Sequence, residues 1–221
     1  LEGRMPNPSG LLVIGLMLGL GIVGFLDDFS KVRRQQALGL SPRGKVIGQL
    51  VVSVAFAWGA VSFPDENGVT PAAQGISVVR GADLVSFVEW GYWAAVIAFA
   101  VWATLIIVGT SNAVNLTDGL DGLAIVPVMV AAASFALIAY LVGNAVFSDY
   151  LQIHGVTGAG ELAVFSGALV GAGLGFLWFN APPASVFMGD TGSLSMGGAL
   201  GVVAVVTKHE LVLGVIGGLF V

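Results

Sequence analysis

The sequence predicts an all-α polytopic membrane protein. Hydrophobic residues make up 57% of the 221 residues and only 10% are charged, whereas a soluble domain carries about 25% charged residues. The mean hydropathy is +0.96, and several apolar runs approach or exceed the roughly 18 residues that a membrane-spanning helix needs. Glycine is also frequent, at 33 residues, which favours close helix packing in lipid.

Six apolar runs are expected to span the membrane: 11–26, 46–63, 91–111, 123–143, 161–179 and 193–207. The last of them, SLSMGGALGVVAVVT, is the weakest candidate because it is short. A seventh run from residue 211 extends eleven residues to Val221, which rise only about 16 Å in a helix. We therefore expect a truncated seventh span, in a fragment of a longer bundle whose residues 1–221 form a single integral membrane domain.

The basic residues predict how the spans are oriented. Five of the eight lie in the connection 27–45: Lys31, Arg33, Arg34, Arg43 and Lys45. The connection 64–90 holds one arginine against four acids. Because short loops rich in Lys and Arg remain in the cytoplasm, 27–45 is expected inside and 64–90 outside. Short alternating stretches around a glycine in 64–90 predict a small external hairpin.

Strict alternation of the spans then brings five aspartates to the cytoplasmic face: Asp27, Asp28, Asp118, Asp121 and Asp190. The first two end the first span, where carboxylates oppose the helix dipole and repel one another unless a cation offsets them. The neighbouring Lys and Arg residues are such cations, so a plain acidic helix end is an alternative for this pair. The convergence of all five is the first indication of a site.

The connection NAVNLTDGLDGLA, residues 112–124, carries amide and carboxylate side chains at a spacing of three. Asp118 and Asp121 are expected to share a helical face. Capping of the next helix by Thr117 or Asp118 would explain one aspartate but not the whole series. The series suits an oxygen-rich ligand or a hard cation, and the flanking Gly119 and Gly122 allow a ligand to approach the backbone.

A third polar connection, NAPPASVFMGDTGS, covers residues 180–193. Its two prolines stop a helix, and GDTGS predicts a new helix start whose free N–H groups suit phosphate. Asp190 is then expected to hold a cation that neutralises the phosphate. Phe187 is expected either to stack on a nucleobase or to anchor the chain at the membrane interface.

The chemistry of these side chains narrows the function. A site rich in acids, without cysteine and with only two histidines in the chain, favours Mg²⁺ or Mn²⁺ over Zn²⁺. With Lys45 or Arg43 as a cationic partner, it suggests phosphoryl transfer between a soluble nucleotide and a lipid. The basic loop also suits anionic lipid head groups. A net charge of −5 argues against nucleic acid as a partner.

The strings GFLDD, NAVNLTDGLDGLA and FMGDTGSLSMGG resemble the phospho-N-acetylmuramoyl-pentapeptide transferases, from about Gly10 to Val221. These enzymes belong to the superfamily of polyprenyl-phosphate N-acetylhexosamine-1-phosphate transferases. The resemblance implies a ten-span bundle, often a homodimer, in the bacterial plasma membrane, with its active site on the cytoplasmic face. It also implies a Mg²⁺-dependent reaction of UDP-N-acetylmuramoyl-pentapeptide with undecaprenyl phosphate, which gives UMP and the first lipid-linked peptidoglycan precursor.

The resemblance implies catalytic roles for five side chains: Asp27, Asp28, Lys45, Asn115 and Asp118. Asp27 matches the proposed base toward the lipid phosphate, and Lys45 matches the lysine that binds the diphosphate. Asp190 matches the Mg²⁺ ligand. Substrate contacts are expected from a second set: Asp121, Phe187, Asn112, Asn180 and Gly119. Within that set, Asp121 and Phe187 match the uridine pocket.

Two parts of the family pattern are missing: the spans that precede GLLVIG and the His-rich loop that follows the ninth span. The 221 residues alone are therefore expected to be inactive. A sister transferase that uses UDP-N-acetylglucosamine is an alternative, although sisters tend toward VDGIDGL and GDAGS. A transporter with coupling carboxylates is a second alternative, but transport sites lie near the bilayer midplane, whereas these acids lie at span ends.

Overall fold

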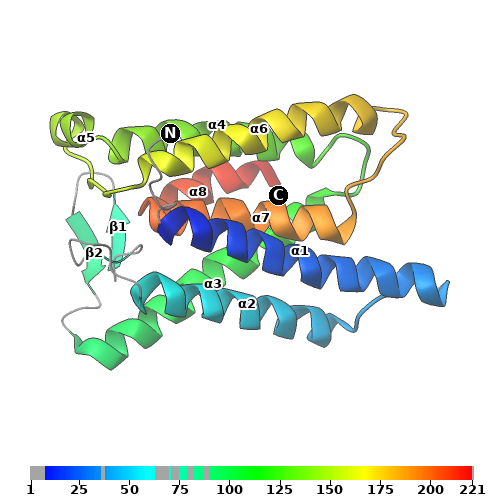
Figure 1. Cartoon of the computed structure of the whole chain (residues 1–221), viewed down its shortest axis with the longest axis horizontal. Helices are drawn as coiled ribbons and strands as arrows, with labels where there is room; N and C mark the ends of the chain where they lie inside the picture. Colours follow the sequence, from blue (N-terminus) through cyan, green and yellow to red (C-terminus); the bar gives the residue numbers. More distant parts are fainter. Residues whose placement is uncertain are drawn as a thin grey trace, which may run out of the picture.

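The computed structural model describes residues 8–35, 38–62, 70, 75–78, 82–86 and 90–220. Within them, six helices are long and apolar enough to cross a membrane: α1 (Pro8–Arg34), α2 (Pro42–Ser62), α3 (Tyr92–Thr117), α4 (Ile125–Val142), α6 (Gly160–Asn180) and α7 (Gly189–Val206). They form an elongated bundle (Figure 1). The all-α class is confirmed, and the chain is an integral membrane protein.

Shorter elements complete the described chain. Strands β1 (Gly75–Val78) and β2 (Ala82–Ser86) pair as an antiparallel hairpin within the segment for which a hairpin was expected. Helix α5 (Ala145–Leu151), capped by the side chain of Asn144, was not expected in its connection. Helix α8 (Glu210–Gly217) and a 3₁₀ turn, η2 (Gly218–Phe220), occupy the seventh apolar run. In Figure 1 the hairpin and α5 lie together at one end of the bundle.

Helix α7 is the central element of the bundle. Of its 18 residues 78% are buried, whereas in the most apolar 18-residue stretches of the other five long helices 22–44% are. Helix α7 packs against α1 and α3. Glycines make this packing possible: a Cβ at Gly197 would lie 2.6 Å from the carbonyl oxygen of Thr110 on α3. The run 193–207, the weakest candidate for a span, therefore forms the innermost helix. Its small residues lower its hydropathy, and the same residues let neighbouring helices approach.

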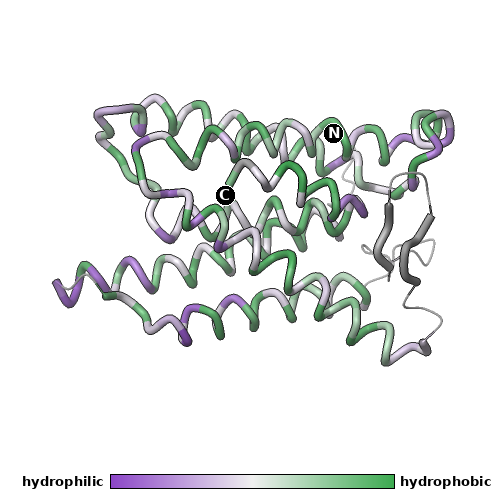
Figure 2. Tube along the Cα trace, turned by 180° about the vertical axis from the view of Figure 1, so that it is seen from behind, coloured by the Kyte–Doolittle hydropathy of each residue, from purple (hydrophilic) through white to green (hydrophobic). Residues whose placement is uncertain are grey.

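The distribution of polarity along the helices matches a membrane-embedded bundle. Figure 2 shows hydrophilic segments gathered toward the helix ends, with apolar stretches between them. Large apolar side chains on the outer faces are exposed, as at Leu18 on α1 and Ile97 on α3. Outward apolar surface is expected where lipid replaces water around a helix.

Two local expectations are wrong. Helix α1 does not end at Asp27 and Asp28 but continues to Arg34, because polar residues suit a helix that extends beyond the hydrocarbon core. Asp118 and Asp121 do not share a helical face, because α3 ends at Thr117 and residues 118–124 form turns. Asp118 is the C-cap residue of α3, and the N-cap residue of α4, at position 124, is an alanine without a side-chain cap bond.

Candidate active site

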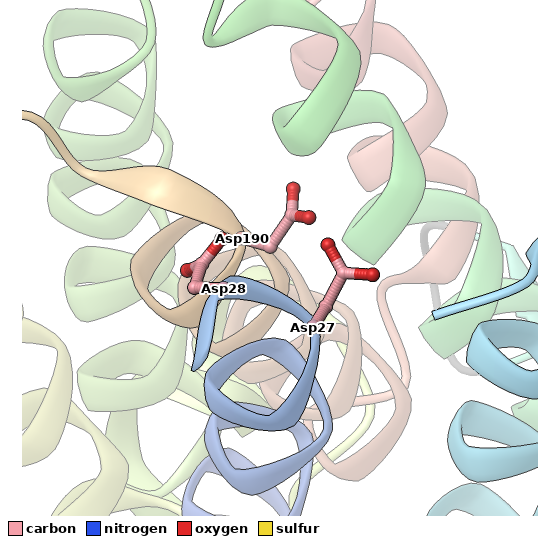
Figure 3. Close-up of side chains that lie close together, drawn as sticks. All are labelled: Asp27, Asp28 and Asp190. Atoms are coloured by element: carbon pink, nitrogen blue, oxygen red, sulfur yellow. The ribbon is translucent and has the colours of Figure 1, made fainter. Parts of the chain in front are cut away.

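Three aspartates from two helices converge at one end of the bundle. Asp27 and Asp28 lie in the last two turns of α1, and Asp190 lies in the first turn of α7. One oxygen from each carboxylate lies within 4.8 Å of the others. Figure 3 shows the three side chains directed toward a common space. The predicted convergence of GFLDD and GDTGS is therefore present in the structure.

A glycine on α1 brings these acids together. A Cβ at Gly24 would overlap the carbonyl oxygen of Asp190 and lie 2.7 Å from the Cα of Thr191. The backbones of α1 and α7 can meet at this depth only because position 24 lacks a side chain. Gly24 is one turn before Asp27 and Asp28, so the close approach places their carboxylates beside the start of α7.

Two lysines offset most of the negative charge of the cluster. The ammonium nitrogen of Lys31 lies 2.6 Å from Asp27 Oδ2, 2.6 Å from Asp190 Oδ2 and 3.4 Å from Asp28 Oδ1. The ammonium nitrogen of Lys45 lies 2.8 Å from Asp190 Oδ2 and 3.4 Å from Asp27 Oδ2. Lys45 thus occupies the expected position. Lys31 was missed as a site residue, although its spacing of three and four from the paired aspartates places it on their face of α1.

Asp27 is almost completely buried, at 1% exposure. Its Oδ1 accepts a hydrogen bond from the backbone N–H of Leu40 at 2.7 Å, and its Oδ2 faces both lysines. A Cβ at Gly39 would lie 2.6 Å from Asp27 Oδ1, so the α1–α2 connection passes directly over the carboxylate. Asp27 therefore joins this connection to the lysine pair.

Asp28 stabilises the beginning of α7 from the neighbouring helix. Its Oδ2 accepts hydrogen bonds from the backbone N–H and the hydroxyl of Thr191, both at 2.9 Å. Helix α7 begins at Gly189, and its own N-cap residue, Met188, makes no side-chain cap bond. The negative charge of Asp28 at a helix N-terminus is favourable. The positive φ of Gly189, +62°, sets the turn into α7.

Asn115 holds the other oxygen of Asp190, and Ser193 accepts a hydrogen bond from the same amide. The amide nitrogen of Asn115 donates to Asp190 Oδ1 and to the hydroxyl of Ser193, the latter at 2.8 Å. Ser193 donates in turn to the carbonyl of Gly189 at 2.8 Å. Asp190 is therefore bound by lysines at one oxygen and by an amide at the other, which fixes its orientation.

Asp118 lies beside this cluster at the end of α3. Burial raises the pKa of its carboxyl, the negative charges of Asp190 and Asp28 raise the pKa further, and the backbone N–H of Gly189 partly opposes these effects. A carboxyl whose pKa is raised by neighbouring negative charges is common where an enzyme holds a cation or an anionic substrate.

A pocket of about 220 Å³ adjoins the cluster, lined by Asp118, Gly119, Leu120, Asp121, Asn180, Phe187 and Gly189. Phe187 is 72% exposed, so its ring face is accessible to a flat ligand. Asp121 Oδ2 accepts a hydrogen bond from the backbone N–H of Ala184 at 3.0 Å. Asn180 accepts from the N–H of Gly122 at 3.0 Å and donates to the carbonyl of Val186 at 2.9 Å. These bonds join the two connections that form the pocket.

The donor set at the cluster fits Mg²⁺. Asp27, Asp28 and Asp190 each offer a hard carboxylate oxygen, and the chain has no cysteine. Such oxygen ligands suit Mg²⁺ or Mn²⁺ and not Zn²⁺. The neighbouring lysines and the N-terminus of α7 add positive charge, so the same space suits a phosphate group.

The structure thus brings ten of the eleven expected residues into two adjoining groups. Six surround the acid cluster: Asp27, Asp28, Lys45, Asn115, Asp118 and Asp190. The other four, Gly119, Asp121, Asn180 and Phe187, line the pocket with Asp118. Asn112 instead donates to Gln49 on α2. The catalytic and substrate roles of all eleven stay predictions.

Comparison with known proteins shows the family to which this chain is similar. A family model described as glycosyl transferase family 4 matches residues 10–208. A curated protein of Rhodopseudomonas palustris (strain BisA53), named phospho-N-acetylmuramoyl-pentapeptide-transferase, is 53% identical over 215 residues. The match covers 97% of this chain and 57% of that relative, so the chain spans a little over half the length of the curated protein.

Proposed function

Because the chain belongs to glycosyl transferase family 4, we propose that it is the membrane-embedded catalytic part of a phospho-N-acetylmuramoyl-pentapeptide transferase. The observation that carries this proposal is the position of the acid and lysine cluster next to the pocket of about 220 Å³. A diphosphate at the cluster and a nucleoside in the pocket would be adjacent parts of one substrate.

The proposed reaction is a phosphoryl transfer. An oxygen of undecaprenyl phosphate attacks the sugar-linked phosphorus of UDP-N-acetylmuramoyl-pentapeptide, and the bond from that phosphorus to the bridging oxygen breaks. UMP leaves with the bridging oxygen, and the lipid carries the new diphosphate. Because the second pKa of a phosphate monoester is about 6, the attacking group is largely ionised at neutral pH, and Asp27 is proposed to accept the remaining proton.

The side chains of the cluster support this chemistry by position and charge. Lys31 and Lys45 are proposed to bind the non-bridging oxygens of the diphosphate, where negative charge is spread in the transition state. Their present partners, Asp27 and Asp190, keep both ammonium groups at the cluster. Asn115 orients Asp190 through its amide. In the pocket, Phe187 is proposed to stack on the uracil and Asp121 to line its edge.

We propose Mg²⁺ as the cofactor, held by Asp190 together with oxygens of Asp27 and Asp28. When bound, the ion would supply positive charge that lowers the barrier to attack on a diphosphate. Asp118 lines the edge of the pocket, and its protonation is proposed to depend on the charge held at this site.

The identity of the relative also bears on the alternatives. A relative 53% identical to this chain is named for the muramoyl-pentapeptide substrate, which supports that branch over the sister that uses N-acetylglucosamine. The acids lie in the last third of α1, past its apolar run, and in the first turn of α7, which disfavours a transporter. We further propose the bacterial plasma membrane as the location, with the cluster on the cytoplasmic face, and a homodimer as the assembly.

The test is substrate choice by the full-length purified protein. UMP release is measured with undecaprenyl phosphate and either UDP-N-acetylmuramoyl-pentapeptide or UDP-N-acetylglucosamine, with and without Mg²⁺. We expect release from the first donor only, and only with the ion. Preference for the second donor would assign the chain to the sister branch, and release from neither would contradict the proposed reaction.

A further inference from the structure

A pair of amides lies one helical turn deeper in the bundle than the acid cluster. Gln49 on α2 is completely buried, at 0% exposure. Its Oε1 accepts a hydrogen bond from Asn112 Nδ2 on α3 at 3.0 Å. The same nitrogen of Asn112 also donates to the carbonyl of Val108 at 2.8 Å. Asn112 is therefore engaged within the helix bundle, and it does not line the pocket beside Phe187.

The two amides lie on the same helix faces as two cluster residues. Lys45 precedes Gln49 by four positions on α2, and Asn115 follows Asn112 by three on α3, spacings that place side chains above one another. Lys45 and Asn115 bind the two oxygens of Asp190. Helices α2 and α3 are thus connected twice, through the carboxylate of Asp190 and through the amide pair below it.

The amide pair is a poor source of stability at this depth. Burying an amide costs free energy that a hydrogen bond only offsets, and replacing both partners of a buried hydrogen bond by apolar groups is often nearly neutral. In addition, Gln49 Nε2 and the hydroxyl of Ser53, one turn deeper, have no hydrogen-bond partner among the described residues. Apolar side chains would fill these positions at lower cost. The pair instead provides specificity of packing, since its hydrogen bond favours one rotation of α2 about its own axis relative to α3.

Rotation of α2 matters because of Lys45. Its side chain has four rotatable bonds, and its ammonium group must be held at Asp190 from the first turn of α2. We propose that Gln49, through Asn112, is a positioning residue that orients α2 so that Lys45 points at Asp190. This inference deepens the proposed function, since Lys45 is the proposed diphosphate ligand. A catalytic group displaced by about 1 Å can lose on the order of a hundredfold in rate.

The first experiment measures catalysis in the full-length protein. Gln49→Leu is expected to lower kcat by about tenfold to a hundredfold with little change in KM and no loss of thermal stability. Ser53→Ala is the matched control, because Ser53 is equally buried on the same face of α2 but its hydroxyl makes no hydrogen bond to a described residue of α3. This control is expected to leave kcat unchanged. Equal losses in both variants, or normal kcat in Gln49→Leu, would overturn the proposal.

The second experiment needs no turnover, so it also separates this inference from the proposed reaction. These 221 residues contain no cysteine, so Lys45→Cys introduces the one thiol of this part of the protein, and any cysteine elsewhere in the full-length protein is replaced by serine. Position 45 faces Asp27 and Asp190, and only 21% of its side chain is exposed. The thiol is therefore expected to react slowly with a negatively charged methanethiosulfonate, which the carboxylates repel. Adding Gln49→Leu should increase the rate at which the mixed disulfide forms, with release of methanesulfinate, at least threefold, whereas adding Ser53→Ala should not. An unchanged rate with Gln49→Leu would show that Gln49 does not position residue 45, whichever substrate the protein uses.

Discussion

Lys31 Nζ lies 2.6 Å from Asp190 Oδ2, although 159 positions separate the two residues in the chain. The ammonium group occupies the space onto which the oxygens of Asp27, Asp28 and Asp190 converge. A divalent cation that used the same oxygens would meet this ammonium group at contact distance. Lys31 and the proposed Mg²⁺ would therefore compete for the same carboxylates.

Lys31→Met tests this competition. Without its ammonium group, the three carboxylates repel one another, so the melting temperature without Mg²⁺ should fall and the rise on adding Mg²⁺ should grow. The measurement is a Mg²⁺ titration of the melting temperature. Arg34→Met is the control, because Arg34 is an exposed residue at the end of the same helix. Identical Mg²⁺ dependence in Lys31→Met and wild type would rule out competition.

Asp190→Asn should abolish most of the activity. The substitution keeps the shape of the side chain but removes the charge that binds both lysines and the proposed Mg²⁺. We expect kcat to fall by at least about a hundredfold, measured as UMP release across a range of Mg²⁺ concentrations. Asp149→Asn, at an exposed position in α5, should behave as wild type. Full activity in Asp190→Asn would contradict the metal assignment.

Asp118→Asn should raise the stability of the folded protein at neutral pH. Burial and the charges of Asp190 and Asp28 raise the pKa of Asp118 in the fold, so the folded state favours the protonated carboxyl. The associated stability is complete below the ordinary aspartate pKa and is lost as pH rises through the raised pKa. At neutral pH the charged group therefore costs stability, and Asn should raise the melting temperature there.

The gain from Asp118→Asn should disappear in acid, where wild-type Asp118 is already protonated. The experiment is a comparison of melting temperatures from pH 7 downward, with Asp149→Asn as the control for removal of an exposed carboxylate. A gain that stayed constant at every pH would mean that ionisation of Asp118 is not its origin.

Gly24→Ala should separate α1 from α7. The new methyl group would overlap the carbonyl oxygen of Asp190, and such overpacking typically costs about 1–3 kcal/mol. Activity should fall as well, because the contact aligns Asp27 and Asp28 with Asp190. Gly15→Ala is the matched control on the same helix, since a Cβ there would meet no atom within 4 Å. Comparable melting temperatures and rates for the two variants would refute the role of Gly24.

Asn180→Ala should loosen the pocket without disturbing the acid cluster. The variant loses both bonds that join Gly122 to Val186, so the KM for the UDP-linked donor should rise about tenfold, while Mg²⁺ dependence is retained. Asn144→Ala removes a different structural asparagine, the cap of α5, and costs about 1 kcal/mol with no change in KM. A normal KM in Asn180→Ala would show that this link does not shape the donor site.

Much of this architecture follows from the sequence, because in a membrane protein the apolar runs and the charges of short loops determine where the polar connections meet. The strings around Asp28, Asp118 and Asp190 therefore predicted one shared site before any geometry was known. The same reasoning made α7 the weakest predicted span. High hydropathy is needed where a helix contacts lipid, and most residues of α7 are buried against other helices.

Other features depend on three-dimensional contacts that one sequence does not contain. In the sequence, Lys31 is one of five basic residues that predict a cytoplasmic loop. Only the fold shows that its ammonium group contacts Asp190. The turn at 118–124 depends on local backbone choices around Gly122, which override the spacing of three. Gln49 is a single amide in an apolar run, and its importance depends on the residue opposite it on α3.

The length of α1 has a consequence for how the two proposed substrates would reach each other. The helix continues six residues past Asp28 to Arg34, about 9 Å at the rise of an α-helix, while Asp27 follows directly on the apolar run 11–26. The carboxylates are therefore expected at the boundary of the hydrocarbon layer, at the depth of lipid head groups and below the end of α1. In the proposed reaction, a lipid-anchored acceptor would arrive by diffusion within the membrane plane, and the water-soluble donor would have to descend to meet it.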